Sequence, residues 1–476
     1  MEPIPCIIDG KDVLTADRFV DLDPSTGEAL AEVSRGGPAE VDLAVDAARA
    51  AFRRTRKNGP EWRSGVLAEL ARLVRRDGER LAELECRDVG KPLRQARADV
   101  AATARYFEFY AAALRTLHGE TLPQADGLVA FTVREPFGVT AHVTPWNYPL
   151  QMTARTLAPA LAAGNCTVLK PAEDTPVTAV EIARLALEAG LEPGMLNVVT
   201  GLGPEAGAAL VGHRDVDHIS FTGSRPVGTA IATAAAANVR PVVLELGGKS
   251  PNLVFADADL DHAVPLIVNA IVQNAGQTCS AGSRVLVERS VHAEVVDRIR
   301  TAFDAMVVAP GMADADLGAV INRRQRDRIA AMVEAARPHV RVVTGGHVPQ
   351  DEGLGGGFYY RPTLLDQVDP QLPIAQEEVF GPVLGITPFD GDREAVELAN
   401  GTEYGLVAAV WTRDVARAHR LAQDLVAGQV FVNTYGAAGG VDLPFGGWKA
   451  SGYGREKGVE GMLGYTQTKT VAVGLR

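Results

Sequence analysis

The stretch GVTAHVTPWNYPLQMTARTLAPALAAGNCTVLKP (138–171) places a helical pattern between two short apolar runs. The runs GVTAHVT and CTVLKP have strand composition. The segment between them has Pro149 at its start and Gly164 just past its end, which is the usual punctuation of a helix. Short strands that are almost wholly apolar are buried on both faces, so this stretch predicts a parallel sheet covered by helices.

The same alternation of strand and helix continues to residue 248. It predicts an α/β fold with a doubly wound parallel sheet, whose ligand lies at the carboxyl ends of the strands. A second alternating set from about 260 to 440 predicts a second α/β domain. Ahead of both sets, residues 38–57 and 61–118 have the pattern of amphipathic helices.

Strand composition returns at GLVAFTVREPFG (127–138) and in the tail YTQTKTVAVG (465–474). Neither segment completes one of the helix-covered sheets. We expect them to pair with each other and to form an arm that docks on another subunit by strand addition.

Composition limits the class of protein. The chain has 476 residues, of which 46% are hydrophobic and 22% charged, and this length and composition suit a globular enzyme of several domains. The net charge of −12 disfavours nucleic acid and anionic membranes as partners. No apolar run reaches the roughly 18–20 residues of a membrane span, and the start lacks the pattern of a signal peptide, so a cytoplasmic location is expected. The four cysteines form no CxxC pair, which argues against a disulfide framework and a structural zinc site.

Cys279 lies in NAGQTCSAGSR (274–284), a run of small residues. A lone cysteine is more often a buried apolar side chain than a nucleophile. Gly276 and Gly282 are expected to clear space around this one. The loop also follows a helix predicted over 260–274, so a reactive thiol is the competing interpretation.

Two polar residues follow predicted core strands. Glu245, in LELGGKS (244–250), is either a general base or a carboxylate that caps a turn or pairs with Lys249. Asn147, in TPWNYP (144–149), is either an oxyanion donor or a helix cap.

Other strand ends predict a dinucleotide cleft. Lys170 and Glu173 follow one strand, and an acid there suits ribose hydroxyls, although a surface ion pair is the alternative. The segment FTGS (221–224) precedes a helix and suits a pyrophosphate, but it is not the GxGxxG fingerprint.

Taken together, these motifs resemble those of the NAD(P)-dependent aldehyde dehydrogenases over essentially the whole chain. The matching stretches, in order, are PWNYP, KPAEDTP, FTGS, LELGGKSPN, GQTCSAGSR, EEVFGPV (377–383) and PFGGWKASGYGRE (444–456). The resemblance implies a dinucleotide-binding domain (1–118 and 138–247), a catalytic domain (248–447) and an oligomerisation arm (119–137 and 464–476).

The resemblance also implies catalytic roles. Cys279 is the nucleophile that forms a thiohemiacetal and then a thioester, and Asn147 with the Cys279 backbone N–H holds the oxyanion. Glu245 activates water for hydrolysis. Relatives that pass the acyl group to coenzyme A lack this glutamate, so water is the expected acceptor and a carboxylic acid the product.

The cofactor implied is NAD, with NADP accepted by some relatives that carry the same acid. Glu173 repels a ribose phosphate and so favours NAD. The residues that the resemblance assigns to the cofactor are Trp146, Lys170, Glu173, Gly203, Phe221, Gly223, Ser224, Glu378 and Phe380.

Residues Tyr148, Met152 and Arg155 are expected to line the substrate tunnel. Arginine at 155 resembles the succinate-semialdehyde dehydrogenase group, in which it clamps a carboxylate, whereas many broad-range relatives have tryptophan. Alternatively, Arg155 pairs with a neighbouring acid where its helix packs. The second arginine of that group is Gln273 here, so the substrate expected is a semialdehyde or another aldehyde with a distal acceptor group. A broad-range aliphatic or aromatic aldehyde dehydrogenase is the alternative.

Functions of other classes fit less well. A cofactor-independent thiol hydrolase would give the cofactor motifs no role. A relative without catalytic activity would not need to keep Cys279, Glu245 and Asn147 together. Gln467 replaces a glutamate that contacts subunit-boundary arginines in some relatives. The arm predicts a homo-oligomer, which is either a homodimer or a homotetramer.

Overall fold

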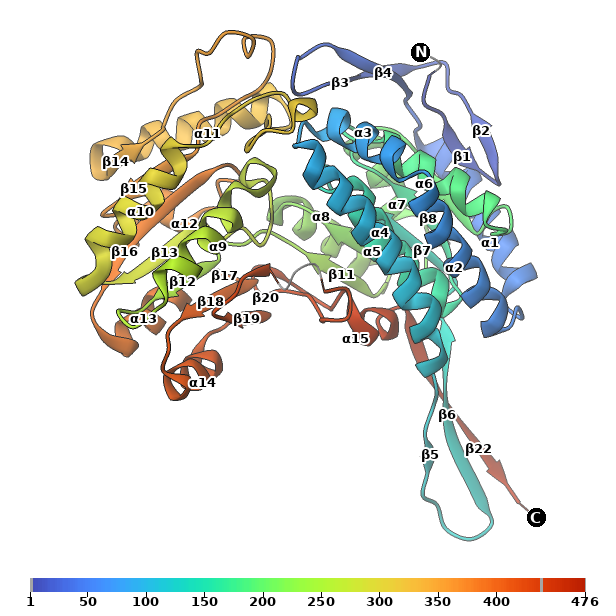
Figure 1. The fold of residues 1–476 in the computed structure, drawn as a ribbon. Coiled ribbons are helices and arrows are strands. Elements are labelled where there is room, and N and C mark those ends of the chain that lie inside the picture. The colour runs from blue at the N-terminus through green and yellow to red at the C-terminus, as the bar shows by residue number, and fades with distance from the viewer. Residues whose placement is uncertain (1–2, 437–439, 476) are drawn as a thin grey trace.

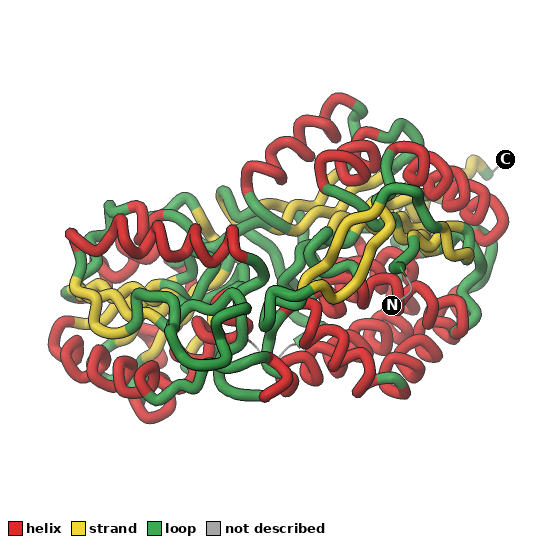
Figure 2. Tube along the Cα trace, turned by 90° about the horizontal axis from the view of Figure 1, so that it is seen from above, coloured by secondary structure: helices red, strands yellow, loops and turns green. Residues whose placement is uncertain are grey.

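The computed structural model describes residues 3–436 and 440–475, which form two α/β units and a protruding arm (Figure 1). Each unit is built on one large sheet, and each sheet has its own hydrophobic core. Seen from above, the strands of both units lie among flanking helices (Figure 2). The predicted α/β architecture, with a doubly wound sheet, a second α/β unit and a strand-built arm, is confirmed.

The first sheet has the strand order β2-β1-β9-β8-β7-β10-β11-β21. Strands β9 to β11 in this order run parallel, and β1 and β21 are antiparallel to their neighbours. The chain adds β8 and β9 on one side of β7 and then β10 and β11 on the other, so a ligand crevice opens at the carboxyl ends of β7 and β10. The strands are β1 (Cys6–Ile8), β2 (Lys11–Val13), β7 (Val139–Val143), β8 (Cys166–Lys170), β9 (Leu196–Val198), β10 (His218–Thr222), β11 (Val242–Glu245) and β21 (Gly452–Tyr453).

Helices cover this sheet on both faces. They are α1 (Pro38–Thr55), α2 (Pro60–Arg76), α3 (Gly78–Val89), α4 (Leu93–Ala113), α5 (Pro149–Ala163), α6 (Val177–Glu188), α7 (Ala208–Gly212), α8 (Arg225–Ala237) and α15 (Gly458–Leu463). Helix α5 begins with Pro149 and ends before Gly164, whose φ of 98° is left-handed, as the sequence predicted. Almost all of its residues are buried, because it packs between the sheet and α4.

The region 61–118, predicted to be amphipathic and helical, is divided into three helices, α2, α3 and α4. Gly90, with a φ of 81°, ends α3 in a conformation that residues with a Cβ rarely adopt, and Pro92 precedes α4. A Cβ on Gly90 would also lie 2.9 Å from the Pro24 side chain. The helix predicted over 260–274 ends earlier, at Val272.

The second sheet has the order β14-β15-β16-β13-β12-β18-β19 and is parallel except for β14. Its strands are β12 (Pro251–Val254), β13 (Arg284–Glu288), β14 (Arg341–Thr344), β15 (Thr363–Asp366), β16 (Val383–Phe389), β18 (Val407–Trp411) and β19 (Gln429–Val432). Its helices are α9 (Leu260–Val272), α10 (His292–Asp304), α11 (Arg323–Ala336), α12 (Pro373–Gln376), α13 (Gly391–Asn400) and α14 (Val415–Asp424). Two strand pairs complete the body: β3 (Arg18–Leu22) with β4 (Ala29–Ser34), and β17 (Tyr404–Gly405) with β20 (Trp448–Lys449).

The junction between the units positions the candidate site. Strand β11 of the first sheet ends at Glu245, and β12 of the second begins at Pro251. The carboxyl edge of the first sheet therefore leads through residues 246–250 into the amino edge of the second. Loops that follow β7, β10 and β11 meet loops that precede β12, β13 and β18.

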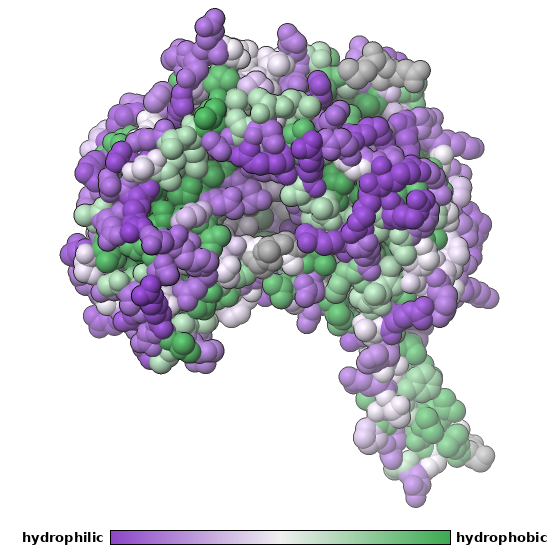
Figure 3. Space-filling view, viewed as in Figure 1, coloured by the Kyte–Doolittle hydropathy of each residue, from purple (hydrophilic) through white to green (hydrophobic). Residues whose placement is uncertain are grey.

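The arm consists of β5 (Thr121–Leu122), β6 (Leu128–Pro136) and β22 (Thr466–Gly474), which project away from the body (Figure 1). The tail pairs antiparallel with β6 along its full length, from Thr466 opposite Pro136 to Gly474 opposite Leu128. This confirms the predicted pairing. Apolar residues gather along one side of the arm (Figure 3). The exposed apolar side chains of the arm include Val129 and Val473. In the described part of the chain, no helix combines the length and apolar character that crossing a bilayer requires.

A fully buried charge cluster joins α3 to α4. The ammonium of Lys91 lies 3.1 Å from Glu85 and 2.5 Å from Asp99, and all three side chains are almost completely excluded from solvent. Asp99 also accepts a hydrogen bond from Gln151 of α5. The Lys91 ammonium lies 4.3 Å from the centre of the Tyr148 ring, so this cluster supports the segment that leads into the site.

We predict that Lys91→Met lowers the free energy of unfolding by about 3–5 kcal/mol, because it leaves two buried carboxylates without their cation. Urea denaturation followed by circular dichroism measures the loss. Lys57→Met, at an exposed position, serves as the control and should change the stability by less than about 1 kcal/mol. Equal stability of the two variants would contradict the prediction.

Candidate active site

Cys279 lies in the loop between α9 and β13, at the amino edge of the second sheet. Its side chain is half-buried and packs against a small apolar cluster of Leu406, Val407 and Phe445. A Cβ on Gly248 would lie 2.5 Å from the Cys279 carbonyl oxygen. The glycine at 248 therefore allows the strand that carries Glu245 to pass directly beside the cysteine loop.

Gly276 and Gly282 were expected to clear space around Cys279, but each is packed against another segment of the chain. A side chain on Gly276 would clash with the Gly381 carbonyl, and one on Gly282 would clash with the side chain of Asn252. Both glycines are thus required by packing of the loop on its neighbours. The sequence showed small residues near Cys279 but not which atoms approach them.

The loop that follows β7 is bonded directly to the cysteine loop. The Asn147 amide donates to the Gln277 carbonyl at 2.8 Å, and Asn274 donates to the Asn147 carbonyl at 2.7 Å. The hydroxyls of Tyr148 and Thr278 are 2.7 Å apart. Asn147 is not the cap of α5, because Tyr148 holds that position. Its amide nitrogen is instead held two residues from the nucleophile candidate.

Glu245 lies in a buried group of charges. Both of its carboxylate oxygens are buried and have no hydrogen-bond partner among the described residues. Nη2 of Arg155 lies 4.0 Å from one of them, while Nε of Arg155 forms an ion pair with Glu456. The guanidinium also lies 4.3 Å from the centre of the Phe445 ring. Glu245 therefore neither caps a turn nor pairs with Lys249 in this structure.

These surroundings change the acidity of both reacting groups. Burial raises the pKa of Glu245 well above its ordinary value, Glu456 raises it further, and Arg155 opposes the shift. Burial also raises the pKa of the Cys279 thiol, to about 11, against the opposing effect of Arg155. A carboxyl held above its usual pKa is suited to take a proton, since it is a stronger base than a solvated one.

The predicted cofactor residues gather in the crevice at the switch point. Lys170 Nζ lies 2.7 Å from Glu173, and a Cβ on Gly203 would lie 3.9 Å from that carboxylate. Burial works to raise the pKa of Glu173, but Lys170 outweighs it and holds that pKa below its ordinary value. The Phe221 ring lies so close to Gly223 that a Cβ there would be 2.6 Å away. Ser224 directly precedes α8.

A second part of the crevice is formed by the segment before β16. Glu378 accepts a hydrogen bond of 3.0 Å from the Gly248 backbone N–H, and burial raises its pKa to about 7. The Phe380 ring meets the Trp146 ring edge to face, with centroids 5.2 Å apart. These two contacts join the segment before β16 to the residues that follow β11 and β7.

Comparison with known proteins identifies the family. The model of the aldehyde dehydrogenase family matches residues 13–471. The chain belongs to the aldehyde dehydrogenase family. It is 41% identical over 473 residues to the mitochondrial aldehyde dehydrogenase of Equus caballus, covering 97% of this chain and 93% of that protein. It is 40% identical over 463 residues to betaine aldehyde dehydrogenase of Bacillus subtilis (strain 168), covering 94% and 93%. The NAD+ complex of an aldehyde dehydrogenase from Bacillus cereus superposes with a TM-score of 0.96 at 37% identity, over 100% of this chain and 97% of that one.

The substrate side of this aldehyde dehydrogenase differs from the expectation for Arg155. Its Nη1 contacts Met152 Sδ at 3.8 Å, and its charge is already paired with Glu456. Gln273 is half-buried at the start of a short 3₁₀ segment, and no hydrogen bond within the described residues joins it to Arg155. The geometry thus resembles the alternative interpretation, in which the arginine pairs with an acid where its helix packs.

Two charged residues of the dehydrogenase site were missed in the sequence. Glu456 closes the motif PFGGWKASGYGRE, and Lys457 follows it. In the sequence, this motif indicates only the resemblance to the aldehyde dehydrogenases and assigns no role to either residue. A glutamate next to a lysine looks like a solvated pair, and only the fold shows that Glu456 is 2% exposed beside Arg155.

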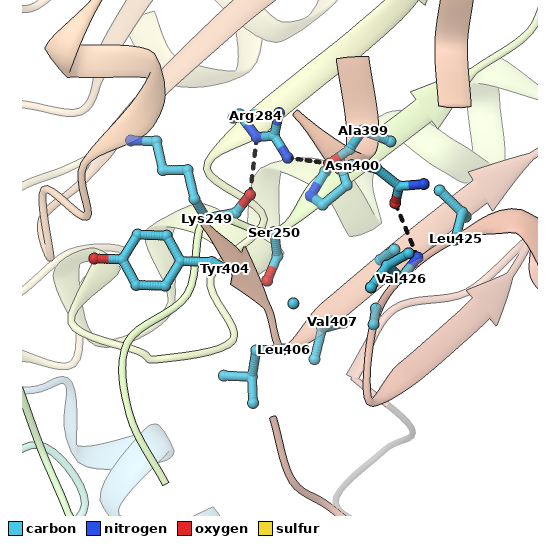
Figure 4. Close-up of a pocket in the computed structure, with 14 residues that line it drawn as sticks. Lys249, Ser250, Arg284, Ala399, Asn400, Tyr404, Leu406, Val407, Leu425 and Val426 are labelled. Atoms are coloured by element: carbon cyan, nitrogen blue, oxygen red, sulfur yellow. Dashed lines mark hydrogen bonds between the residues drawn. The ribbon is translucent and has the colours of Figure 1, made fainter. Parts of the chain in front are cut away.

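A cavity beside Lys249 is too small to hold an aldehyde substrate. It has a volume of about 10 Å³, room for roughly one water, and lies at the start of β12 between Lys249, Ser250 and Arg284 (Figure 4). The Arg284 guanidinium donates to the carbonyls of Lys249, Leu398 and Ala399 at 2.7–2.8 Å. Arg284 therefore fixes the backbone on which Gly248 and Lys249 lie.

The value of kcat should increase with pH as Glu245 loses its proton. We predict that Arg155→Met shifts this increase to higher pH by about one unit or more, because removing the cation lets the pKa of Glu245 rise further. Glu456→Gln removes the charge that raises this pKa and should move the increase to lower pH. Steady-state kinetics from pH 6 to 10 measure both shifts, and thermal unfolding checks that each variant folds. Arg72→Met, on the exposed side of α2, is the control. Profiles that coincide with the wild type would contradict the prediction.

Proposed function

We propose that this aldehyde dehydrogenase oxidises an aldehyde to a carboxylic acid through a thioester on Cys279. The Cys279 thiolate attacks the aldehyde carbon, and the carbonyl electron pair moves to the oxygen. The Asn147 amide and the Cys279 backbone N–H stabilise that oxyanion. Asn147, Glu245 and Cys279 come from the loop after β7, the end of β11 and the loop before β13, which meet at one junction, and this is the observation that carries the proposal.

Glu245 is the proposed general base. Its carboxylate accepts a proton from water as the water oxygen attacks the thioester carbon, and the thiolate leaves as the acid forms. The absence of hydrogen-bond partners within the described chain leaves both Glu245 oxygens available for this proton. The presence of this base favours water over coenzyme A as the acyl acceptor.

NAD is the proposed cofactor, and when bound it supplies the acceptor of the hydride that leaves the Cys279 adduct. The carboxylate of Glu173, held by Lys170, suits ribose hydroxyls and repels a 2′-phosphate. Gly203 lies beside that carboxylate, and Phe221, Gly223 and Ser224 lead into the start of α8, where a pyrophosphate is stabilised. The remaining proposed contacts are Glu378, for the nicotinamide ribose, and the rings of Trp146 and Phe380.

The aldehyde enters past Tyr148 and Met152. A carboxylate-bearing semialdehyde is one candidate substrate, although Arg155 is already paired with Glu456 and is not free to bind its carboxylate. A broad-range aliphatic or aromatic aldehyde dehydrogenase is the alternative. A cofactor-independent thiol hydrolase is disfavoured, because it gives no role to Glu378 or to the Lys170–Glu173 pair.

The arm is the proposed means of forming a homodimer or homotetramer. Its strand β22 exposes apolar side chains and unpaired edge groups that a second copy of the chain can cover. The division into a dinucleotide-binding domain and a catalytic domain follows the two sheets, with β21 returning to the first sheet from beyond residue 447.

We predict that Cys279→Ser abolishes NADH formation, whereas Glu245→Gln still forms about one NADH per active site in a burst and then turns over at least about a hundredfold more slowly. Stopped-flow absorbance of NADH with a simple aldehyde measures both. Unchanged NADH formation in Cys279→Ser would refute the covalent mechanism. Steady turnover of Glu245→Gln without a burst would refute the assigned base.

We predict that Glu173→Ala raises kcat/KM with NADP relative to NAD by about tenfold or more, since it removes a charge that repels the ribose phosphate. The ratio of the two kcat/KM values measures the effect. Glu205→Ala, at a half-buried acid that is paired with Arg35 two residues after Gly203, is the control. An unchanged ratio in Glu173→Ala would show that another residue sets the cofactor preference.

A further inference from the structure

Lys457 has a backbone conformation that is rare for any residue with a side chain. Its φ is 61° and its ψ is 170°, a region occupied almost only by glycine. Such strain persists only where the surroundings enforce it, and it is concentrated at functional sites. It is therefore a reason to ask what the Lys457 side chain does.

The backbone on both sides of Lys457 is fixed by hydrogen bonds. Glu456 and Phe445 exchange two backbone hydrogen bonds of 2.7 Å. The Gly458 N–H donates to Val441 at 2.9 Å, and the Tyr110 hydroxyl donates to the Gly458 carbonyl at 3.0 Å. These bonds hold the strained residue in place.

The Lys457 side chain reaches the apolar cluster against which Cys279 packs. Its ammonium lies 5.1 Å from the centre of the Phe445 ring. This ring belongs to the apolar cluster against which Cys279 packs. The Arg155 guanidinium lies 4.3 Å from the same ring. Two cations thus border one aromatic ring beside the reacting thiol.

The two cations differ in how their charges are balanced. Arg155 is paired with Glu456, whereas no carboxylate oxygen within the described residues lies within 4.0 Å of the Lys457 ammonium. Burial, and then Arg155, lower the pKa of Lys457 to about 8, so the ammonium is still mostly charged at neutral pH. A half-buried cation without a counter-ion gains from a carboxylate that the substrate brings.

We propose that Lys457 is a specificity-determining residue whose ammonium binds a carboxylate at the far end of the aldehyde. The preferred substrate class is then a short ω-oxo acid, whose methylene chain lies along the Phe445 ring while its aldehyde carbon reaches Cys279. Arg155 stays with Glu456 and acts on the base. This inference rests on the proposed covalent role of Cys279, and it assigns the substrate charge to a residue other than Arg155.

The test compares succinate semialdehyde with butanal, which has the same number of carbons and no carboxylate. In the wild type, kcat/KM should be higher for succinate semialdehyde. Lys457→Met should lower the ratio of the two kcat/KM values about tenfold or more, mainly through KM for the acidic substrate. Lys457→Arg, which keeps the charge, should restore most of the ratio. Lys57→Met, at an exposed lysine, is the matched control and should leave both values unchanged.

Other outcomes overturn the inference in recognisable ways. Equal losses for both aldehydes in Lys457→Met, with slower alkylation of Cys279 by iodoacetamide, would mean that Lys457 supports the thiolate rather than the substrate. A selective loss in Arg155→Met but not in Lys457→Met would assign the carboxylate to Arg155. A wild type that prefers butanal would exclude the acidic substrate class. A wild type that forms no NADH with either aldehyde would instead refute the proposed function.

Discussion

The close approach of Gly248 to the carbonyl of Cys279 is the constraint around which this site is organised. It exists because the carboxyl edge of one sheet runs, within a few residues, into the amino edge of the next. Glu245 lies at the start of this short connection. Within it, the Gly248 backbone N–H donates a hydrogen bond to Glu378. A side chain at 248 would clash with the Cys279 carbonyl and so push the segment that follows Glu245 away from the Cys279 loop.

Much of the architecture is predictable from the sequence, because it depends on local signals. Apolar runs alternating with helices predicted both sheets, and the strand composition of the tail predicted its pairing with β6. Cys279, Glu245 and Asn147 were also predictable as site candidates, since each follows or precedes a core element. The helix breaks at Asp77 and Gly90 were missed, because the breaking glycine is required by contact with Pro24, a residue distant in the sequence.

The partners of the charged residues could not be predicted in this way. Arg155 lies on a helix of the first unit, and Glu456 follows the last strand added to the same sheet, so only the closed fold brings them together. Gly276 and Gly282 show the same limit. Their sequence spacing around Cys279 suggested an open pocket, whereas each is fixed by a backbone or side chain from a distant segment.

Burial and the neighbouring cations have opposite effects on the pKa values of Cys279 and Glu245. Burial raises the pKa of both Cys279 and Glu245, so removing a proton from either group costs more free energy than it would in water. Arg155 opposes both shifts, and Lys457 opposes them as well. A buried base of this kind is effective only while its neighbouring cations stay in place. The ion pair between Arg155 and Glu456 therefore matters for the proposed base, because it holds beside Glu245 both the cation that lowers its pKa and the acid that raises it.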